Sequence, residues 1–209
     1  MSSKEMRARQ AVITALAVSA LILAISTLIA STQNLSILER NLFASIFEAP
    51  NQLYGLALFI TLLGSGWMVA VLLVLLFIMK KNNLAIHVLV LSSVTFIITQ
   101  YLKDIIARPR PLELVSDLVA RQYSAAGFGF PSGHSALSMV CALAILPHVT
   151  KPWKVSIIVV VILVGLSRIY LGVHAPLDVI GGWSLAILVW SLFMLIFPKN
   201  SLANSSRKP

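Results

Sequence analysis

The sequence predicts an all-α protein, an integral membrane bundle of six transmembrane helices with one short helix at the membrane interface. Hydrophobic residues make up 58% of the 209 residues and charged residues only 11%, whereas soluble domains carry roughly 25% charged residues. The mean hydropathy is +0.93. Apolar runs long enough to cross a bilayer recur along the chain between short polar segments. These observations exclude a water-soluble globule.

The first apolar run covers residues 11–31 and follows Lys4, Arg7 and Arg9. A run of about 20 apolar residues behind a basic start is typical of a spanning helix. A secretory signal peptide has the same order of charges, but its apolar core is only ~7–15 residues long and ends at a small-residue cleavage site. This run is longer and lacks a clear cleavage site, so we expect a retained helix.

The next two elements differ in polarity. Residues 32–52 carry apolar side chains at spacings of three and four among charged ones, which predicts a short amphipathic helix at the interface. The second span, 53–79, is interrupted by Gly64-Ser65-Gly66. These glycines allow either a kink or a close contact between helices.

The remaining four crossings are separated by a long connection or by short basic or polar segments. We expect them at 84–102, 133–149, 155–171 and 176–197. All six spans form a single membrane domain, 1–209. An even number of crossings places both termini on the same side of the membrane.

The basic residues predict which side that is. Ten of the 16 Lys and Arg residues fall on the side of the termini: Lys4, Arg7, Arg9, Lys80, Lys81, Lys151, Lys154, Lys199, Arg207 and Lys208. The other six fall on the opposite side: Arg40, Lys103, Arg108, Arg110, Arg121 and Arg168. The positive-inside rule therefore places the protein in the cytoplasmic membrane with both termini in the cytoplasm.

The net charge of +9 indicates an anionic partner, either a nucleic acid or a membrane surface. Because the chain has no basic stripe interleaved with aromatic residues, we expect the lipid bilayer as the partner and no nucleic acid. Three further residues are interpreted structurally. The single cysteine, Cys141, lies in an apolar run as a small hydrophobe, and His87 and His148 lie at the cytoplasmic ends of their spans as interfacial residues.

Three polar segments meet on the outward side, and the first follows the third span. Lys103, Arg108 and Arg110 stand there, on the side poorer in positive charge. A topology signal belongs on the other side, so a cluster of interfacial snorkelling cations does not explain them. The planar fork of arginine matches phosphate oxygens and lysine adds a point charge, so the cluster predicts an anionic substrate.

The second segment opens the fourth span. Ser132 is a good N-cap, and the amides of Gly133 and His134 at a helix N-terminus form an anion site. A histidine at the edge of a membrane span is expensive to place there and indicates function.

The third segment joins the last two spans. Pro176 fits the first turn of a helix, which puts Asp178 in the same turn, where the helix dipole favours its charge. Asp178 lies four residues after His174 and can accept a hydrogen bond from its ring, which would fix the tautomer and raise its basicity. Alone, this pattern also fits a capping Asp beside an incidental His. With the other segments it gives the groups that covalent phosphoryl transfer needs.

Residues 103–178 resemble the complete three-part signature of the type 2 phosphatidic acid phosphatase family, in the acid phosphatase and vanadium haloperoxidase superfamily. The matching motifs are Lys103-x6-Arg110-Pro111, Pro131-Ser132-Gly133-His134 and Ser167-Arg168-x5-His174-x3-Asp178. The six-span plan is similar to the membrane branch of that family. The haloperoxidases are soluble proteins, and the apolar composition of this chain excludes a soluble protein of that kind.

The resemblance implies that His174 attacks phosphorus and becomes a phosphohistidine, with Asp178 orienting it. His134 would protonate the leaving group and later help to activate water. The phosphate oxygens would be held by Lys103, Arg110, Arg168, Ser132 and the amide of Gly133. No metal or other cofactor is implied. Arg108 lies outside the fixed positions of the signature, and its role is open.

The implied activity is that of a lipid phosphatase with its site facing outward. Candidate substrates are undecaprenyl diphosphate, phosphatidylglycerol phosphate, phosphatidate and a lipid A phosphate, with the first favoured because an outward site suits carrier recycling. A lipid phosphotransferase and a non-catalytic lipid-phosphate binder or transporter are alternatives, although a transporter would carry polar residues near mid-membrane. We expect the connection 112–130 to shape head-group choice. The sequence does not predict an oligomeric state.

Overall fold

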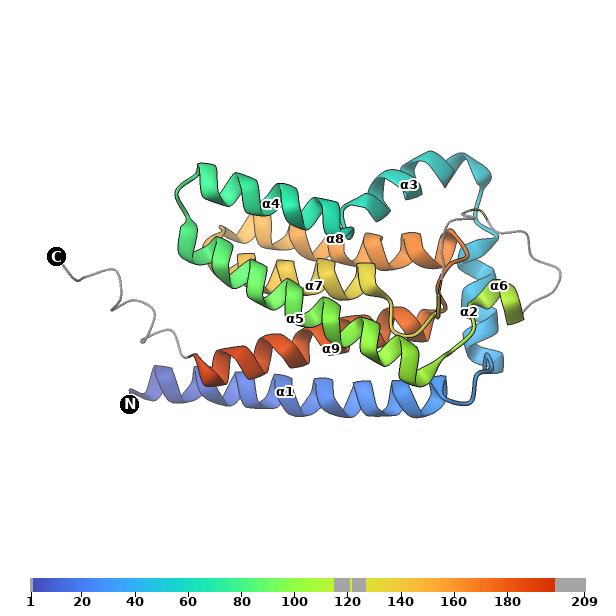
Figure 1. Cartoon of the computed structure of the whole chain (residues 1–209), viewed down its shortest axis with the longest axis horizontal. Coiled ribbons are helices and arrows are strands. Elements are labelled where there is room, and N and C mark those ends of the chain that lie inside the picture. Colours follow the sequence, from blue (N-terminus) through green and yellow to red (C-terminus); the bar gives the residue numbers. More distant parts are fainter. Residues whose placement is uncertain (1, 115–120, 122–126, 198–209) are drawn as a thin grey trace.

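The computed structural model describes residues 2–114, 121 and 127–197, and this part of the chain is helical without strands (Figure 1). Its α-helices are α1 (Ser3–Ala30), α2 (Ile37–Phe47), α3 (Tyr54–Leu62), α4 (Gly66–Ile78), α5 (Asn82–Ile106), α6 (Pro111–Leu114), α7 (Gly133–Ile145), α8 (Lys151–Tyr170) and α9 (Pro176–Ile196). Short 3-10 turns cover Asn51–Leu53 and Leu146–His148. The predicted all-α class is confirmed.

Four helices of the described chain, α1, α5, α8 and α9, are long and apolar enough to cross a membrane, and α3 with α4 forms a pair bent by 51° that can count as a fifth span. The multi-pass membrane architecture is therefore confirmed, but the predicted count of six is not reached. The expected fourth span, 133–149, contains only the 13 residues of α7 before a 3-10 turn. At 1.5 Å per residue α7 is about 20 Å long, shorter than the ~30 Å hydrocarbon core.

Local signals explain where the observed helices differ from the expected spans. The helix α1 begins at Ser3, well before residue 11, because Ser2 and Glu5 form a capping box. The helix α8 begins at Lys151, because Thr150 is its N-cap and a proline stands in its first turn. The helix α7 ends at Ile145, and the 3-10 turn that follows contains Pro147, which cannot continue the α-helical hydrogen bonds.

The glycines of the second span both break it and allow a close contact, as predicted. Ser65 caps α4 by accepting a hydrogen bond from the Met68 amide, which starts a new helix after the break. A Cβ added to Gly64 would lie 2.6 Å from Val164 Cγ1 and 2.8 Å from the carbonyl oxygen of His134. The bend between α3 and α4 thus rests directly against the start of α7.

The short helix α7 lies among α5, α8 and α9 and packs against each of them (Figure 1). Apolar side chains of α4, α5, α7 and α9 form the main buried cluster, which includes Leu76, Val88, Val140 and Leu185. A helix that is covered by other helices need not match the thickness of the lipid. In Figure 1 the start of α7 stops short of the end that α5 and α8 reach, so this start is recessed within the bundle.

The predicted amphipathic helix is α2, which runs across the ends of the longer helices, at the end of the molecule opposite the start of α1 and the end of α9 (Figure 1). Its Phe43 and Phe47 rings stack with centroids 5.4 Å apart. They pack against Ile169 of α8 and Val179 of α9. This apolar face docks α2 onto the bundle beside the three polar segments of the sequence.

Candidate active site

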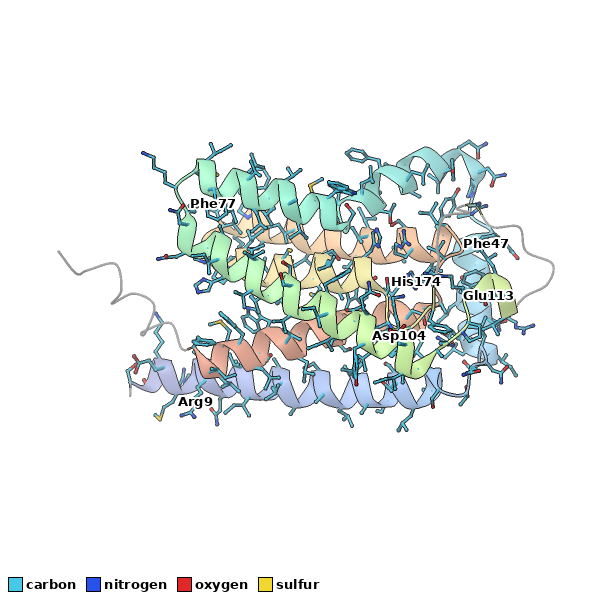
Figure 2. The ribbon with its side chains drawn as sticks, viewed as in Figure 1. Arg9, Phe47, Phe77, Asp104, Glu113 and His174 are labelled. Carbon is cyan, nitrogen blue, oxygen red and sulfur yellow. The ribbon has the colours of Figure 1, made fainter. Side chains whose placement is uncertain are left out.

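The polar segments singled out in the sequence converge at the α2 end of the bundle. Figure 2 shows His174 in that half of the molecule, with Asp104 and Glu113, while Arg9 and Phe77 lie at the other end. His174 is 2% exposed, and Asp178 is fully buried. The group is built from the last turns of α5 and α8, the start of α7 and the turn into α9.

The turn into α9 holds the predicted pair of His174 and Asp178. Pro176 is the first residue of the helix, and Asp178 lies in its first turn, as predicted. Asp178 Oδ2 accepts a hydrogen bond from the Ala175 amide at 2.9 Å and lies 3.4 Å from His174 Nδ1. Because an ionised carboxylate only accepts hydrogen bonds, this contact favours a proton on Nδ1 and leaves the lone pair on Nε2. Nε2 is then the ring atom available for attack on an electrophile.

The electrostatic surroundings of His174 keep its imidazole neutral. Burial lowers the pKa of His174 well below 6.5, and the positive charges of Arg168, Lys103 and Arg110 and the nearby His134 lower it further. A neutral imidazole near physiological pH is the nucleophilic form.

Backbone carbonyls fix two of the predicted phosphate-binding cations. Arg110 donates from Nε to the Gly127 carbonyl at 2.8 Å and from Nη1 to the Val173 carbonyl at 2.6 Å, directly before His174. Lys103 Nζ donates to the Phe128 carbonyl. Both side chains are thereby ordered before any anion arrives, which reduces the entropy cost of binding.

The third predicted cation is held by a helix that the sequence interpretation did not connect with the site. Arg168 is 4% exposed and donates from Nη1 to Thr61 Oγ1 at 2.8 Å. Thr61 is a buried residue of α3, close to the break at Gly64. A lone threonine inside an apolar run gives no sequence signal of such a role.

The start of α7 is bound to the turn into α9. Ser132 is the N-cap of α7, as predicted, and its Oγ accepts hydrogen bonds from the Ser135 amide at 3.5 Å and the Ser135 hydroxyl at 3.0 Å. Its own amide donates to the Asp178 carbonyl at 2.9 Å. Gly182 allows this approach, because a Cβ there would lie 2.5 Å from the Ser132 carbonyl oxygen.

The two imidazoles share their electrostatic neighbours. Lys103, Arg110 and Arg168 act on His134 as they act on His174. The half-exposed Gly133 and His134 begin α7, whose N-terminal amides carry the positive end of the helix dipole. The described residues therefore bring two histidines, three cations and a helix N-terminus together, which suits an anion with a reactive centre such as phosphate.

Arg108, whose role the sequence left open, is fully buried on the other side of Asp178. Its Nη1 donates to Asp178 Oδ1 at 2.8 Å and to Glu39 Oε1 at 3.0 Å, and its Nη2 donates to Glu39 Oε2 at 2.7 Å. Glu39 belongs to the amphipathic helix α2. The sequence interpretation missed Glu39, because in an amphipathic helix a glutamate is expected to face solvent.

Other residues singled out in the sequence lie elsewhere. His87 packs edge-on against the Phe193 ring, with centroids 5.5 Å apart, and Cys141 is partly buried beside the main apolar cluster. Of the connection 112–130, residues 112–114, 121 and 127–130 are described, and Arg121 donates to the carbonyls of Phe47, Ala49 and Tyr170. Asp117 and Tyr123, two residues that suggested a role in head-group choice, lie outside the described residues, as do Lys199, Arg207 and Lys208. In the described part of the chain, no group of three or more His, Cys, Asp or Glu could hold a metal ion.

Comparison with known proteins gives consistent matches. The family model of the PAP2 superfamily matches residues 83–202. The chain is 31% identical over 145 residues to an undecaprenyl-diphosphatase of Sulfolobus acidocaldarius, covering 69% of both proteins. It is 36% identical over 107 residues to the phosphatidylglycerophosphatase B of Bacillus subtilis, covering 46% of this chain and 49% of that protein.

Two solved structures share the fold. Aquifex aeolicus LpxE superposes with a TM-score of 0.66 at 29% identity, covering 78% of this chain and 97% of that one. The transmembrane PAP2-type phosphatidylglycerolphosphate phosphatase of Bacillus subtilis superposes with a TM-score of 0.63 at 25% identity, covering 89% of this chain and 96% of that one.

Proposed function

The chain belongs to the PAP2 superfamily, in which its relatives are phosphatases, and we propose that it hydrolyses a lipid phosphate or diphosphate through a phosphohistidine on His174. One observation carries the proposal: the buried His174 has Nδ1 turned to Asp178, with Lys103, Arg110 and Arg168 as its charged neighbours. A nucleophile with an orienting carboxylate beside a group of cations is the arrangement that covalent phosphoryl transfer requires.

In the first step, the phosphate oxygens bind the three cations and the amides at the start of α7, with Ser132 beside them. His174 Nε2 then attacks phosphorus, and the bond from phosphorus to the lipid oxygen breaks with its electron pair staying on that oxygen. The negative charge of the bound phosphate raises the proton affinity of His134, which is then protonated and donates a proton to the leaving oxygen. The cations stabilise the charge that spreads over the phosphoryl oxygens as the bond breaks.

In the second step, water attacks the phosphohistidine. His134, now neutral, accepts a proton from this water, and the bond between phosphorus and Nε2 breaks with its electron pair returning to His174. Inorganic phosphate leaves, and both histidines regain their starting forms. The mechanism assigns no step to a metal ion.

We propose that the site faces outward, with both termini in the cytoplasm and α7 counted as the sixth crossing. The excess of Lys and Arg on the side of the membrane where we place both termini supports this orientation. The lipid tail would stay in the bilayer while the head group reaches the start of α7. Undecaprenyl diphosphate is the first candidate substrate, because an outward site suits carrier recycling and one relative bears that activity in its name.

The test is a phosphate-release assay with purified protein in detergent, over undecaprenyl diphosphate, phosphatidylglycerol phosphate, phosphatidate and a lipid A phosphate. We expect release from at least one lipid, loss of release in His174→Ala, and an acid-labile, base-stable phosphoryl group on the wild-type enzyme after a quench. Activity retained in His174→Ala would refute the mechanism. Transfer of the phosphoryl group to an acceptor lipid instead of water would identify a phosphotransferase. No turnover of any of the lipids would favour a binding protein.

A further inference from the structure

A buried ion pair between Arg108 and Glu39 lies against the carboxylate that faces His174. We propose that Arg108 and Glu39 are positioning residues that fix Asp178 and, through it, His174, so that the short helix α2 is part of the catalytic apparatus. The inference rests on the proposed function, because it assumes that His174 is the nucleophile.

The first argument is that the two carboxylate oxygens of Asp178 have different partners. Oδ1 accepts from Arg108 Nη1 at 2.8 Å, while Oδ2 accepts from the Ala175 amide at 2.9 Å and faces His174 Nδ1 at 3.4 Å. Arg108 is 0% exposed, so water does not compete for these bonds. With a fixed partner on each oxygen, the carboxylate cannot rotate away from the imidazole. A planar guanidinium imposes this orientation more strictly than a lysine would.

The second argument is that Glu39 holds Arg108 in place from a different helix. Both of its carboxylate oxygens accept from Arg108, at 3.0 and 2.7 Å, and Oε1 also accepts from the Leu177 amide at 3.2 Å. Glu39 therefore contacts the first turn of α9 as well as Arg108. It is 6% exposed, and the Asn34 carbonyl accepts a further bond from Arg108 Nη2 at 3.0 Å. These contacts lock α2 and the chain before it onto the turn that carries His174.

The third argument is the charge. One guanidinium is shared by two carboxylates, so Asp178 receives only part of the positive charge of Arg108 and remains a strong acceptor for the His174 N–H. Neutralising Glu39 would concentrate that charge on Asp178 and weaken its bond to His174. Removing Arg108 would leave two carboxylates side by side in a buried place, where one of them would take up a proton. Arg108 bonds to Asp178, to Glu39 and to the Asn34 carbonyl, and Glu39 bonds to Arg108 and to the Leu177 amide, so we expect both to act on kcat and not on KM.

The test measures kcat and KM for Glu39→Gln and Arg108→Lys, each alone and combined with Asp178→Asn, at high enzyme concentration for the weak variants. We expect each single variant to lower kcat about 10- to 100-fold with KM changed less than about twofold, because a small misplacement of a reacting group has effects of this size. In the Asp178→Asn background we expect less than about a twofold further loss, because the residues act through Asp178. Glu48→Gln, at the exposed end of the same helix, is the matched control and should leave kcat unchanged.

Independent losses that multiply in the double variants, or a loss seen mainly in KM, would overturn the proposal. So would full activity in Glu39→Gln. Arg108→Met serves as a severe variant, and its folding is checked by size-exclusion chromatography and thermal unfolding; if it fails to fold, Glu39→Gln and Arg108→Lys decide the question. A failure of the proposed function is recognised separately, by activity that survives in His174→Ala.

Discussion

The two halves of the bundle bury different kinds of side chain. In the half nearer the termini, α4, α5, α7 and α9 pack through aliphatic residues such as Val88, Val140 and Leu185. In the other half the buried set includes Arg108, Arg110, Arg168, His174 and Asp178. Burying charges costs free energy that their mutual attraction often only balances, whereas apolar packing stabilises directly. The comparison indicates that the apolar half supplies stability and the charged half supplies the site. It predicts that substitutions in the charged half will lower activity, whereas substitutions in the apolar half will lower the free energy of unfolding.

The largest effect on activity is expected at Asp178. Asp178→Asn keeps the shape of the side chain but removes the charge that selects the His174 tautomer, so kcat should fall by about 10³- to 10⁴-fold, as for an orienting carboxylate of a catalytic triad. The measurement is phosphate release under saturating substrate. Asp104→Asn, an exposed acid at the end of α5, is the control and should retain full activity. An Asp178→Asn enzyme within tenfold of wild type would contradict the assigned role.

A smaller loss is expected at Thr61, which links the bent α3–α4 pair to the site. Thr61→Val removes the hydroxyl that accepts from Arg168 and should reduce kcat/KM about tenfold, because a buried charged donor loses this acceptor. Thr61→Ser keeps the hydroxyl and should stay near wild type. Equal losses in both variants would show that the packing of the methyl group matters, and not the hydrogen bond.

The pH dependence tests the electrostatics of the charged half. Since the pKa of His174 lies below 6.5, its lone pair persists as the pH falls through 6.5, and the acid limb of kcat/KM should appear only at lower pH. The same depressed pKa means that stability from this group is present above pH 6.5 and is lost as the pH falls through the folded value. Arg110→Gln removes a neighbouring positive charge and should move the limb toward 6.5. A limb that does not move would indicate titration of the substrate.

The smallest effect on activity is expected in the apolar half. Leu185→Ala removes a side chain that is 1% exposed in the main cluster and should lower the free energy of unfolding by about 2–5 kcal/mol. Because Leu185 lies outside the polar group, kcat measured well below the unfolding temperature should change less than about twofold. A large fall in kcat without loss of stability would show that the halves are not separable.

The features that the sequence predicted correctly depend on residues that are close together along the chain. Apolar runs located α1, α5, α8 and α9, and the cap at Ser132 followed from residue types alone. The contact between His174 and Asp178 was also predictable, because both lie in one turn.

The missed features depend on tertiary packing. Glu39 and Arg108 are 69 residues apart, and Thr61 and Arg168 are 107 residues apart. No local pattern shows that an acid on an amphipathic helix will turn inward, or that a threonine in an apolar run will face an arginine. The length of α7 was overestimated, because hydropathy continues through Pro147 while the α-helical hydrogen bonds do not.

The bond from the Ser132 amide to the Asp178 carbonyl, with Gly182 pressed against the same turn, has a mechanical consequence. The segment that carries His134 and the segment that carries His174 are fastened directly to each other. When the bilayer thickens or thins, the peripheral helices can tilt to match it. The spacing of the two imidazoles is then set by protein contacts alone, which insulates it from the composition of the surrounding lipid.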